Sequence, residues 1–438
     1  MKPVEDDNDE NPRSSNTMVK TSTLGKKPVK SRVLTTFTVK DLKNGENQLT
    51  RHSTGLSEFD RILMGGMVDG QVVLIGAEPG FGKSTLCLSV LAHFAENMPV
   101  LYASGEESER QIASRAERMH VNNDNLHIVA TKNVENTLKT ADSLNVKALV
   151  VDSLQTMGSE AIVGSIGSVA QSKDAAYQYT EWAKQHGAMV ILISQFTKND
   201  DVAGSNMIAH IVDTILVGES SLDSPLKFLR SRKNRYGKTD EVGVFVHEDD
   251  GLHSVSNPAG YFIGEDTKPI QGSAVSFCRD GARLLPVEVN ALVTKSVYPN
   301  PQRQVSGLDL NRSRILIAAL GKYANMTEAL SIADVFITTM SGLKVSDTSV
   351  DLAILAAVMS SACGIEPAVR TAWVGEAALT GYIKGGTAFL DSKIKEAERL
   401  GFERIVIPQA AFKQVVGKIK AKIEIVPINK IKDLKSLL

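Results

Sequence analysis

The sequence contains 438 residues, and its 49 lysines and arginines nearly balance its 50 aspartates and glutamates, which leaves a formal net charge of −1. This length suits two domains with substantial cores, and the balanced charge argues against a global field that would draw the whole chain to nucleic acid. The three cysteines are scattered, which argues against a disulfide framework and against a zinc site built on C-x-x-C pairs.

Residues 1–50 are predicted to form a flexible, charged N-terminal tail. Five acids occur among the first ten residues, and a Ser/Thr/Lys-rich stretch with few core-forming residues follows. The basic stretch could contact nucleic acid or act as a solvated linker, and both alternatives stay open. No signal-peptide core follows Met1 and no apolar run is long enough to span a membrane, so we expect a cytoplasmic protein without membrane contact.

A phosphate-binding loop is predicted within residues 72–86, VVLIGAEPGFGKSTL. An apolar run stops at a glycine-rich turn, which opens into a helix over residues 84–95. The glycines let backbone N–H groups surround a triphosphate, the lysine brings a cation to the β and γ phosphates, and the hydroxyl after it ligates magnesium. The residues assigned to ATP binding are Glu78, Pro79, Gly80, Phe81, Gly82, Lys83, Ser84 and Thr85. Ser84 is also a predicted Mg²⁺ ligand, and Ala77 replaces the first glycine of the motif.

Carboxylates are predicted at the ends of two buried strands. Residues 100–104 form one strand, followed by Glu106 and Glu107, and a carboxylate there can orient the water that attacks the γ phosphate. Glu106 is the preferred candidate and Glu107 the alternative. Residues 148–152, ALVVD, form the other strand, whose terminal Asp152 is predicted to reach Mg²⁺ through water.

Two further stretches are predicted to be loops beside this site. Residues 157–172 are small and poor in charge, which argues against a place in the core. A buried strand over residues 189–194 ends at Gln195, whose amide can sense the γ phosphate and pass its presence to the next loop, residues 196–207. Lys198 in that loop is the predicted DNA-phosphate contact, with a solvent-facing lysine as the alternative.

These motifs resemble a known family. The segment STGLSEFDRILMGGMVDGQVVLIGAEPGFGKST, residues 53–85, is similar to the start of the RecA-type ATPase core, and it is closest to the bacterial RadA (Sms) family of recombination ATPases. The segment SGEESERQIASRAERM, residues 104–119, resembles the same family. The resemblance implies that Glu106 is the catalytic glutamate and that residues 157–172 line the channel of a ring. Gln195 stands where this family more often has histidine.

Lys233 and Arg235 are predicted to act on the nucleotide of a neighbouring subunit. They are two residues apart, so an extended backbone presents both cations on one face. Such a pair alone would more often be a solvated face, but the segment Lys233 to Gly237, KNRYG, resembles the KNRFG signature of RadA. The resemblance implies that the pair stabilises the charge that develops on the neighbour's γ phosphate, as an arginine finger does.

A second domain is expected at residues 272–438, joined by a linker at 258–271 to an ATPase domain at 51–257. It reads as an α+β unit. Strands are expected at 274–278, 284–292, 334–338 and 404–407, and helices at 312–323, 350–361 and 392–400. The helix at 350–361 is apolar on nearly every face, so it should be buried. Segments such as MSGLKVSDTSVDLAILAAVMSS and RLGFERIVIP resemble the Lon-protease-like domain that ends RadA proteins. The expected fold class is therefore α/β, with a RecA-like P-loop ATPase core followed by an α+β Lon-protease-like domain.

The Lon resemblance raises an alternative function, an ATP-dependent serine protease that uses a Ser/Lys dyad. It aligns Ser349 with the nucleophile, but counting back from Gly401 places Asp391 at the position of the lysine, and Lys393 lies two residues further along. A two-residue shift turns a helical side chain by about 200°. We therefore expect Ser349 to be structural and the domain to be proteolytically inactive, with a role in ring assembly or DNA binding.

RadA proteins usually begin with a four-cysteine zinc module, which does not occur in this sequence, so the resemblance covers about residues 51–410. It implies a DNA-dependent ATP hydrolase and helicase that uses ATP and Mg²⁺. A closed homo-oligomeric ring, expected to be a hexamer, would move along single-stranded and branched DNA and drive branch migration in homologous recombination and DNA repair. A RecA-type recombinase partner and a nucleoid-associated location are further expectations. The alternatives are a DnaB-like replicative helicase, a KaiC-like signalling ATPase and the Lon-type protease.

Overall fold

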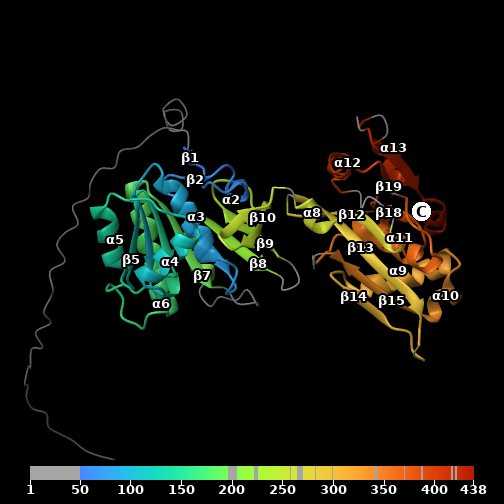
Figure 1. Ribbon diagram of the computed structural model, residues 1–438, viewed down its shortest axis with the longest axis horizontal. Coiled ribbons are helices and arrows are strands. Elements are labelled where there is room, and N and C mark those ends of the chain that lie inside the picture. The colour runs from blue at the N-terminus through green and yellow to red at the C-terminus, as the bar shows by residue number, and fades with distance from the viewer. Residues whose placement is uncertain are drawn as a thin grey trace, which may run out of the picture. The chain divides into compact units, whose positions relative to one another are not determined.

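The computed structural model describes residues 50–195, 205–220, 225–256, 258–263, 270–281, 283–297, 299–340, 344–368, 370–385, 388–415, 418–419 and 422–438 (Figure 1). The chain divides into two units, residues 1–48 and residues 49–438, and all described elements belong to the second. The predicted tail lies outside the described residues up to residue 49. Among the residues described, no helix combines the length and the apolar character needed to cross a membrane.

The first part of this unit is built on a nine-stranded sheet with the order β11-β10-β9-β8-β3-β7-β6-β4-β5. The strands from β8 to β5 are parallel, and β9, β10 and β11 extend the sheet in antiparallel fashion. The elements are β1 (Arg51–His52), α2 (Ser57–Ile62), β2 (Met67–Val68), β3 (Val72–Ala77), α3 (Lys83–Ala95), β4 (Val100–Ser104), α4 (Glu109–Arg118), β5 (Leu126–Ala130), α5 (Val134–Ser143), β6 (Ala148–Asp152), η1 (Leu154–Thr156), α6 (Val169–His186), β7 (Met189–Gln195), α7 (Ser205–Ile211), β8 (Thr214–Ser220), β9 (Leu226–Asn234), β10 (Val242–Glu248), β11 (Gly251–Ser254) and α8 (Ala259–Phe262). The predicted α/β core is confirmed.

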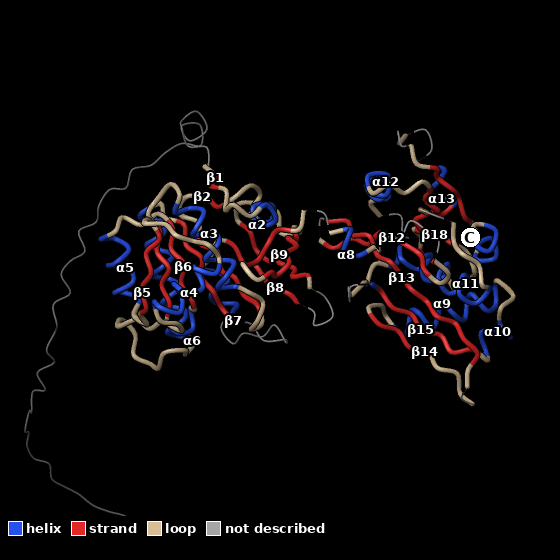
Figure 2. The backbone as a smooth tube through the Cα atoms, in the orientation of Figure 1, coloured by secondary structure: helices blue, strands red, loops and turns tan. Residues whose placement is uncertain are grey.

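Side chains of the central strands alternate between two layers of helices, because successive residues of a strand point to opposite faces. In β3, Val73 and Ile75 pack in a cluster with α2, α3 and α4, whereas Val72 and Leu74 pack with α5, α6 and α7. A parallel strand that is buried on both faces needs an uninterrupted apolar run, which explains the sequence VVLI. The result is a sheet between two helical layers, with helices on both sides of the strands (Figure 2).

The second part is built on a seven-stranded sheet with the order β14-β15-β13-β12-β16-β19-β20. The β12, β13 and β15 strands form an antiparallel meander, and the remaining pairs are parallel. The elements are β12 (Ser273–Asp280), β13 (Arg283–Lys295), β14 (Arg303–Ser306), α9 (Leu310–Tyr323), α10 (Thr327–Ser331), β15 (Ala333–Thr339), η3 (Thr348–Val350), α11 (Asp351–Cys363), β16 (Thr371–Trp373), β17 (Glu376–Ala377), β18 (Ile383–Gly385), α12 (Leu390–Arg399), β19 (Arg404–Pro408), α13 (Gln409–Val415), β20 (Glu424–Ile428) and η4 (Ile431–Ser436). This is an α+β arrangement, as the sequence predicts.

The α11 helix forms the centre of the second core. All of its residues from Asp351 to Ser360 are buried, and it packs against β12, β13 and α9. Full burial of a leucine or isoleucine side chain contributes about 1.5–3 kcal/mol, so a helix that is apolar all round belongs in a core. The predicted burial of this helix is confirmed. The other strands and helices predicted here are also present, whereas β14, β16, β20, α10 and α13 are not among the predicted elements.

The predicted division of the unit at residues 258–271 stays a proposal. Residues 264–269 lie outside the described part, and α8 occupies the beginning of the predicted linker. Leu226, Val244 and Val255 from the first part belong to the same hydrophobic cluster as α11. The two parts therefore share apolar packing at the point where the chain passes from one sheet to the other.

Candidate functional site

Four neighbouring parallel strands end at one edge of the nine-stranded sheet, and each leads into a predicted site residue. The β3 strand leads into the phosphate loop, β7 ends at Gln195, β6 ends at Asp152, and Glu106 follows β4. In the sheet these strands lie side by side in the order β3-β7-β6-β4. Because ligands of open α/β sheets bind beyond the carboxyl ends of the strands, this edge is the candidate nucleotide site.

The phosphate loop joins β3 to α3, and the backbone shape favours glycine at two of its positions. Gly80 and Gly82 have φ angles of +80° and +100°, in the left-handed region that favours glycine. A Cβ on Gly82 would lie 2.2 Å from Leu252 Cδ1, so a larger residue there would also displace the buried Leu252 side chain. Ala77 is the last residue of β3 and does not lie in the turn itself, so alanine is accommodated at the motif's first position. The Phe81 side chain is fully buried, so this residue can offer a ligand only its backbone.

Lys83 begins α3 and folds back over its own loop. Its Nζ donates hydrogen bonds to the carbonyl oxygens of Ala77, at 2.7 Å, and Glu78, at 3.1 Å. Burial lowers the pKa of Lys83, while the nearby charges of Asp152 and Glu106 oppose this shift. The three charged groups predicted for the site therefore lie close enough to influence one another. A lysine held only by carbonyl oxygens can exchange those bonds for phosphate oxygens.

Asp152 is buried at the end of β6 and accepts a hydrogen bond at 2.6 Å from the hydroxyl of Tyr102 on β4. Burial, followed by the charge of Asp152, raises the pKa of Tyr102, so the phenol stays a donor. Burial likewise raises the pKa of the Cys87 thiol. The Ser84 hydroxyl and the Asp152 carboxylate are hard oxygen donors, and they fit Mg²⁺ better than a soft metal. Tyr102 was not among the residues that the sequence predicts for this site.

The structure separates the two candidate glutamates. Glu106 Oε1 accepts a hydrogen bond at 2.5 Å from Ser153 Oγ and lies 3.5 Å from Gln195 Nε2, so it faces the ends of β6 and β7. Glu107 instead forms an ion pair at 2.6 Å with Arg115 on α4. A carboxylate already bound to an arginine is poorly placed to accept a proton, so the geometry favours Glu106 as the residue that orients water.

Gln155 is a further residue of the site that sequence reasoning missed. Its Nε2 donates to Ser194 Oγ at 2.6 Å and to the carbonyl oxygen of Gln195 at 3.4 Å, while its own Oε1 is buried without a partner. It therefore joins the segment after Asp152 to the end of β7. The signal available in the sequence was the polar SLQT that directly follows ALVVD.

Lys233 and Arg235 lie near the opposite end of β3 from the phosphate loop. Lys233 Nζ donates to the carbonyl oxygens of Ala209 and Val212, at 2.5 and 2.6 Å, and Arg235 Nη1 lies 3.2 Å from Asp213 Oδ1. The backbone N–H of Asp213 bonds to the carbonyl of Val72, the first residue of β3. Arg235 follows the end of β9 and is not part of the strand, but both cations reach the carboxyl end of α7, so the prediction that they share one side holds.

The two predicted loops have different outcomes. Lys198 lies outside the described residues. In the stretch 157–172, Met157 is fully buried and the last residues begin α6, so the prediction that this stretch stays out of the core is wrong at both ends. The buried Gln171 side chain fixes the turn between them, because it bonds to backbone groups of residues 159, 162 and 164. Val163 at its tip is fully exposed.

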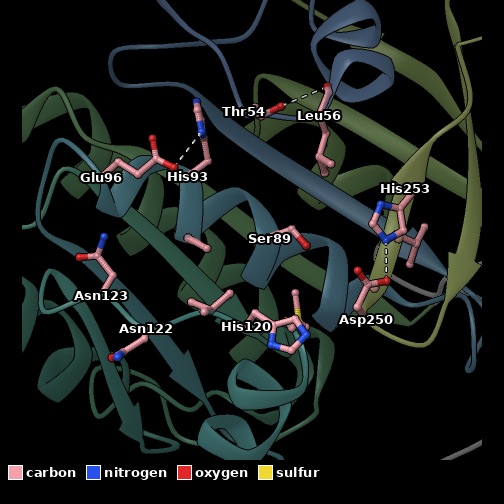
Figure 3. A pocket seen from close by; sticks show the side chains of 16 residues that line it. Thr54, Leu56, Ser89, His93, Glu96, His120, Asn122, Asn123, Asp250 and His253 are labelled. Atoms are coloured by element: carbon pink, nitrogen blue, oxygen red, sulfur yellow. Dashed lines mark hydrogen bonds and ion pairs between the residues drawn. The ribbon is translucent and has the colours of Figure 1, made fainter.

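A polar pocket of about 490 Å³ opens beside α3, where it is lined by side chains from four separate segments (Figure 3). The lining includes His93, His120 and His253, and His253 Nε2 lies 2.7 Å from Asp250 Oδ1. Ser89 in its wall is six residues after the phosphate-loop lysine, which corresponds to about 9 Å along a helix. The residues that line the pocket do not include those of the phosphate loop, and the sequence analysis did not predict this pocket.

In the second part, Ser349 and Lys393 are in direct contact. Lys393 Nζ donates to Ser349 Oγ at 2.5 Å and forms an ion pair at 3.1 Å with Asp347 Oδ2. The expectation that the helical shift turns Lys393 away is wrong, because Lys393 lies on the buried face of α12 whereas Asp391 is exposed. Ser349 Oγ donates its proton to the carbonyl oxygen of Phe277 at 3.2 Å, away from the amine.

Comparisons with known proteins found a matching family model, several relatives and a similar solved structure. Residues 48–201 match the model of a family described as AAA domain. DNA repair protein RadA of Pseudomonas aeruginosa is 38% identical over 361 residues, which is 82% of this chain and 79% of that protein. The RadA proteins of Escherichia coli and Bacillus subtilis are 37% and 36% identical over 89% and 82% of this chain, and over 84% and 78% of their own length. The crystal structure of a KaiC-like protein from Pyrococcus horikoshii matches with 19% identity and a TM-score of 0.41, covering 48% of this chain and 100% of that one.

Proposed function

Because this chain belongs to the RadA family of DNA repair proteins, we propose that it is an ATP-driven ring that moves on single-stranded and branched DNA and promotes branch migration in homologous recombination. The family and the matching AAA domain make it a P-loop ATPase of DNA repair. The ring, the helicase activity and the kind of DNA are parts of the proposal. A hexamer in the cytoplasm, associated with the nucleoid and with a RecA-type recombinase, completes it.

The proposed chemistry assigns one task to each residue at the sheet edge. Lys83 leaves its two carbonyl partners and binds the β and γ phosphates of ATP. Glu106 orients the attacking water, and Gln195, which lies against Glu106, senses the γ phosphate. Ser84 and Asp152 would hold Mg²⁺, which supplies charge neutralisation to the phosphates when it is bound.

One observation carries the proposal that hydrolysis is shared between subunits. The phosphate loop follows Ala77 at the carboxyl end of β3, whereas Arg235 is bound to Asp213, which bonds to Val72 at the amino end. Six residues of a strand span about 17 Å, so the cation is remote from its own phosphate loop. The Arg235 side chain is therefore available to contact the nucleotide bound by another subunit. A head-to-tail interface of this kind generates a closed ring when its rotation closes.

The DNA-binding surface is proposed for the two loops that follow β6 and β7. The ordered turn around Val163 follows the segment that carries Asp152 and Gln155, and the predicted loop with Lys198, which lies outside the described residues, follows Gln195 in the sequence. Both loops therefore start at residues of the candidate site. This order of residues supports a mechanism in which a change in the bound nucleotide alters the loops that contact DNA. Lys198 remains the proposed contact with a DNA phosphate.

The second domain is proposed to be a Lon-like, proteolytically inactive module that assembles the ring or binds DNA. The contact between Ser349 and Lys393 is the observation that could favour a protease, but both side chains are fully buried and the serine proton points to Phe277. A DnaB-like replicative helicase shares the proposed core chemistry, and the similarity to RadA proteins along both halves favours the recombination role.

The test of this proposal mixes two inactive variants of the full chain. Lys83→Ala removes the phosphate-loop cation but leaves Arg235, and Arg235→Ala does the reverse. If Arg235 acts on the neighbouring site, a 1:1 mixture regains about a quarter of the wild-type ATP turnover, because one interface in four then combines an intact site with an intact cation. If the mixture stays as inactive as the separate variants, the shared site is wrong.

A further inference from the structure

Asp213, between α7 and β8, is fastened to the amino end of the strand that leads into the phosphate loop. Its backbone N–H donates to the carbonyl oxygen of Val72 at 3.1 Å, and its side-chain Oδ2 accepts the N–H of Val72 at 3.0 Å. The residue is 1% exposed. A buried carboxylate is retained only where charges or hydrogen bonds compensate for its lost hydration, so the partners of this group identify its task.

Two cations from different elements meet this one carboxylate. Lys184, near the end of α6, places Nζ 2.5 Å from Oδ2, and Arg235 places Nη1 3.2 Å from Oδ1. The backbone N–H of Arg235 also donates to the carbonyl oxygen of Asp213, at 3.1 Å. Arg235 is therefore bound to Asp213 through its backbone and through its side chain.

The contacts of the two proposed trans cations differ. Lys233 Nζ donates to two carbonyl oxygens at the end of α7, and burial, followed by the charge of Arg235, lowers its pKa. The Arg235 side chain is 51% exposed although Asp213 and the carbonyl of His210 hold part of its guanidinium group. Lys233 is thus hydrogen-bonded to the last turn of α7, while Arg235 keeps N–H groups that face outward.

We propose that Asp213 is a positioning residue for hydrolysis, which holds Arg235 in the orientation that reaches the phosphate of the neighbouring subunit. The inference rests on the proposed function, since it needs Arg235 to act between subunits. A long arginine side chain loses much conformational freedom when it binds, and a fixed carboxylate beneath it pre-organises the guanidinium group. Asp213 is bonded to Val72 of β3 on one side and to the exposed Arg235 on the other. We refer to this arrangement of three residues as the bracket.

The alternative is that Asp213 serves the fold of its own subunit through Val72. The variant Asp213→Asn separates the two roles, because the amide oxygen can still accept the N–H of Val72 while the charge that holds Arg235 is lost. We expect ATP turnover to fall at least about tenfold, since pre-organised charge is lost at the reacting phosphate, with the affinity for a fluorescent ATP analogue kept within about twofold.

The decisive measurement places Asp213→Asn in mixtures with the two reference variants. Mixed with Lys83→Ala, it should regain turnover as Arg235→Ala does, because its own phosphate loop is intact and the partner supplies a well-held Arg235. Mixed with Arg235→Ala, it should stay inactive, because both variants lack the same function. The control is Asp142→Asn, which removes an exposed carboxylate that pairs with Trp182 and His186 at the end of the same α6 helix, and it should leave turnover unchanged.

Rescue by Arg235→Ala, in place of Lys83→Ala, would assign Asp213 to its own subunit's site and overturn the inference. Unchanged turnover in Asp213→Asn alone would overturn it as well. If Asp213→Asn fails to bind nucleotide, Asp213→Glu is scored in the same two mixtures. It keeps the charge but displaces the carboxylate by one methylene group, so it should bind nucleotide, lose turnover through misplacement of Arg235, and be rescued by Lys83→Ala and not by Arg235→Ala. Loss of binding in both variants also counts against the inference. The mixture of Lys83→Ala with Arg235→Ala tests the shared site separately, so failure of the bracket and failure of the ring mechanism are distinguishable.

Discussion

Lys393 and Ser349 form a 2.5 Å hydrogen bond in the core of the second part, with both side chains almost completely shielded from solvent. A Ser/Lys hydrolase requires the serine to give its proton to the amine. Here the amine donates to the serine and pairs with Asp347, and the serine donates to Phe277. The contact therefore reads as a buried structural network and not as an active dyad.

Replacing Lys393 should reduce the stability of the protein. It should not change proteolysis, because we expect the wild-type protein to have no proteolytic activity. Lys393→Met leaves Asp347, which is 22% exposed, without its countercharge, so we expect the free energy of unfolding to fall by about 1–3 kcal/mol. Ser349→Ala removes the hydrogen bond to the Phe277 carbonyl and the acceptor of the buried Lys393 amine, and it should cost about 1–3 kcal/mol. Urea unfolding measures both changes. Degradation of casein by the wild-type protein that Ser349→Ala abolishes would establish the protease that we reject.

The same network predicts a pH dependence. Burial raises the pKa of Asp347, but the N–H groups of Ser349 and Arg279 and the charge of Lys393 outweigh it, so the pKa lies below its ordinary value. A depressed pKa stabilises the folded state above the unfolded pKa of about 3.9, and this stability is lost as the pH falls through the folded pKa. Wild type should therefore be more stable than Asp347→Asn at neutral pH, and the gap should close in strong acid. A gap that is unchanged at the lowest pH would contradict the assignment.

The sequence predicts the site well where local order carries the information. An apolar run, a glycine-rich turn and a helix in sequence predict the phosphate loop. ALVVD alone is a weak signal, and it predicts a role for Asp152 only because it follows the phosphate loop in a β/α order. Tyr102 and Gln155 were missed because their roles depend on which strands become neighbours, and the order β3-β7-β6-β4 cannot be read from any one segment.

The Lys393 error has a different cause. Counting back from Gly401 assigned the inward position to Asp391, but the buried face of α12 contains Leu390, Lys393, Ile394 and Ala397. This spacing of three and four residues is the amphipathic pattern of a helix, so the apolar neighbours of Lys393 already indicated that it points inward. The pattern of apolar residues around Lys393 was more informative than the number of residues between it and Gly401.

Lys83→Ala should abolish ATP turnover and its response to DNA. The lysine contacts the carbonyl oxygens of Ala77 and Glu78, and it is the one cationic residue among residues 78–85, all of which the structure describes. We expect single-stranded DNA to raise wild-type turnover severalfold. Phosphate release by the variant should stay at the level of buffer without protein, with or without DNA. Steady-state phosphate release with and without an oligonucleotide measures this. A wild-type rate that ignores DNA would remove the basis for a DNA motor.

Glu106→Gln and Glu107→Gln form a matched pair that identifies the group orienting water. The first removes a carboxylate beside Ser153 and Gln195, so turnover should fall by about 10²–10⁴ while nucleotide affinity is kept. The second removes only the ion pair with Arg115 and should change turnover by less than about threefold, as is typical of a partly exposed pair. Equal losses in the two variants would mean that the geometry misassigns the base.

Arg235→Ala should separate nucleotide binding from hydrolysis. If the guanidinium group stabilises charge on a neighbour's phosphate, turnover falls by about 10³–10⁵, as loss of an arginine finger does. Binding of a fluorescent ATP analogue should stay within about twofold of wild type, because Asp213 and Arg235 lie near the opposite end of β3 from the phosphate loop. Lys238→Ala, three residues further on and exposed, is the matched control and should leave both quantities unchanged.

Loss of binding together with turnover would instead mean that Arg235 supports its own subunit. Since Arg235 also binds the end of α7, a thermal melt of each variant must accompany the kinetics, and an unshifted melting temperature with lost turnover is the combination that the shared site requires.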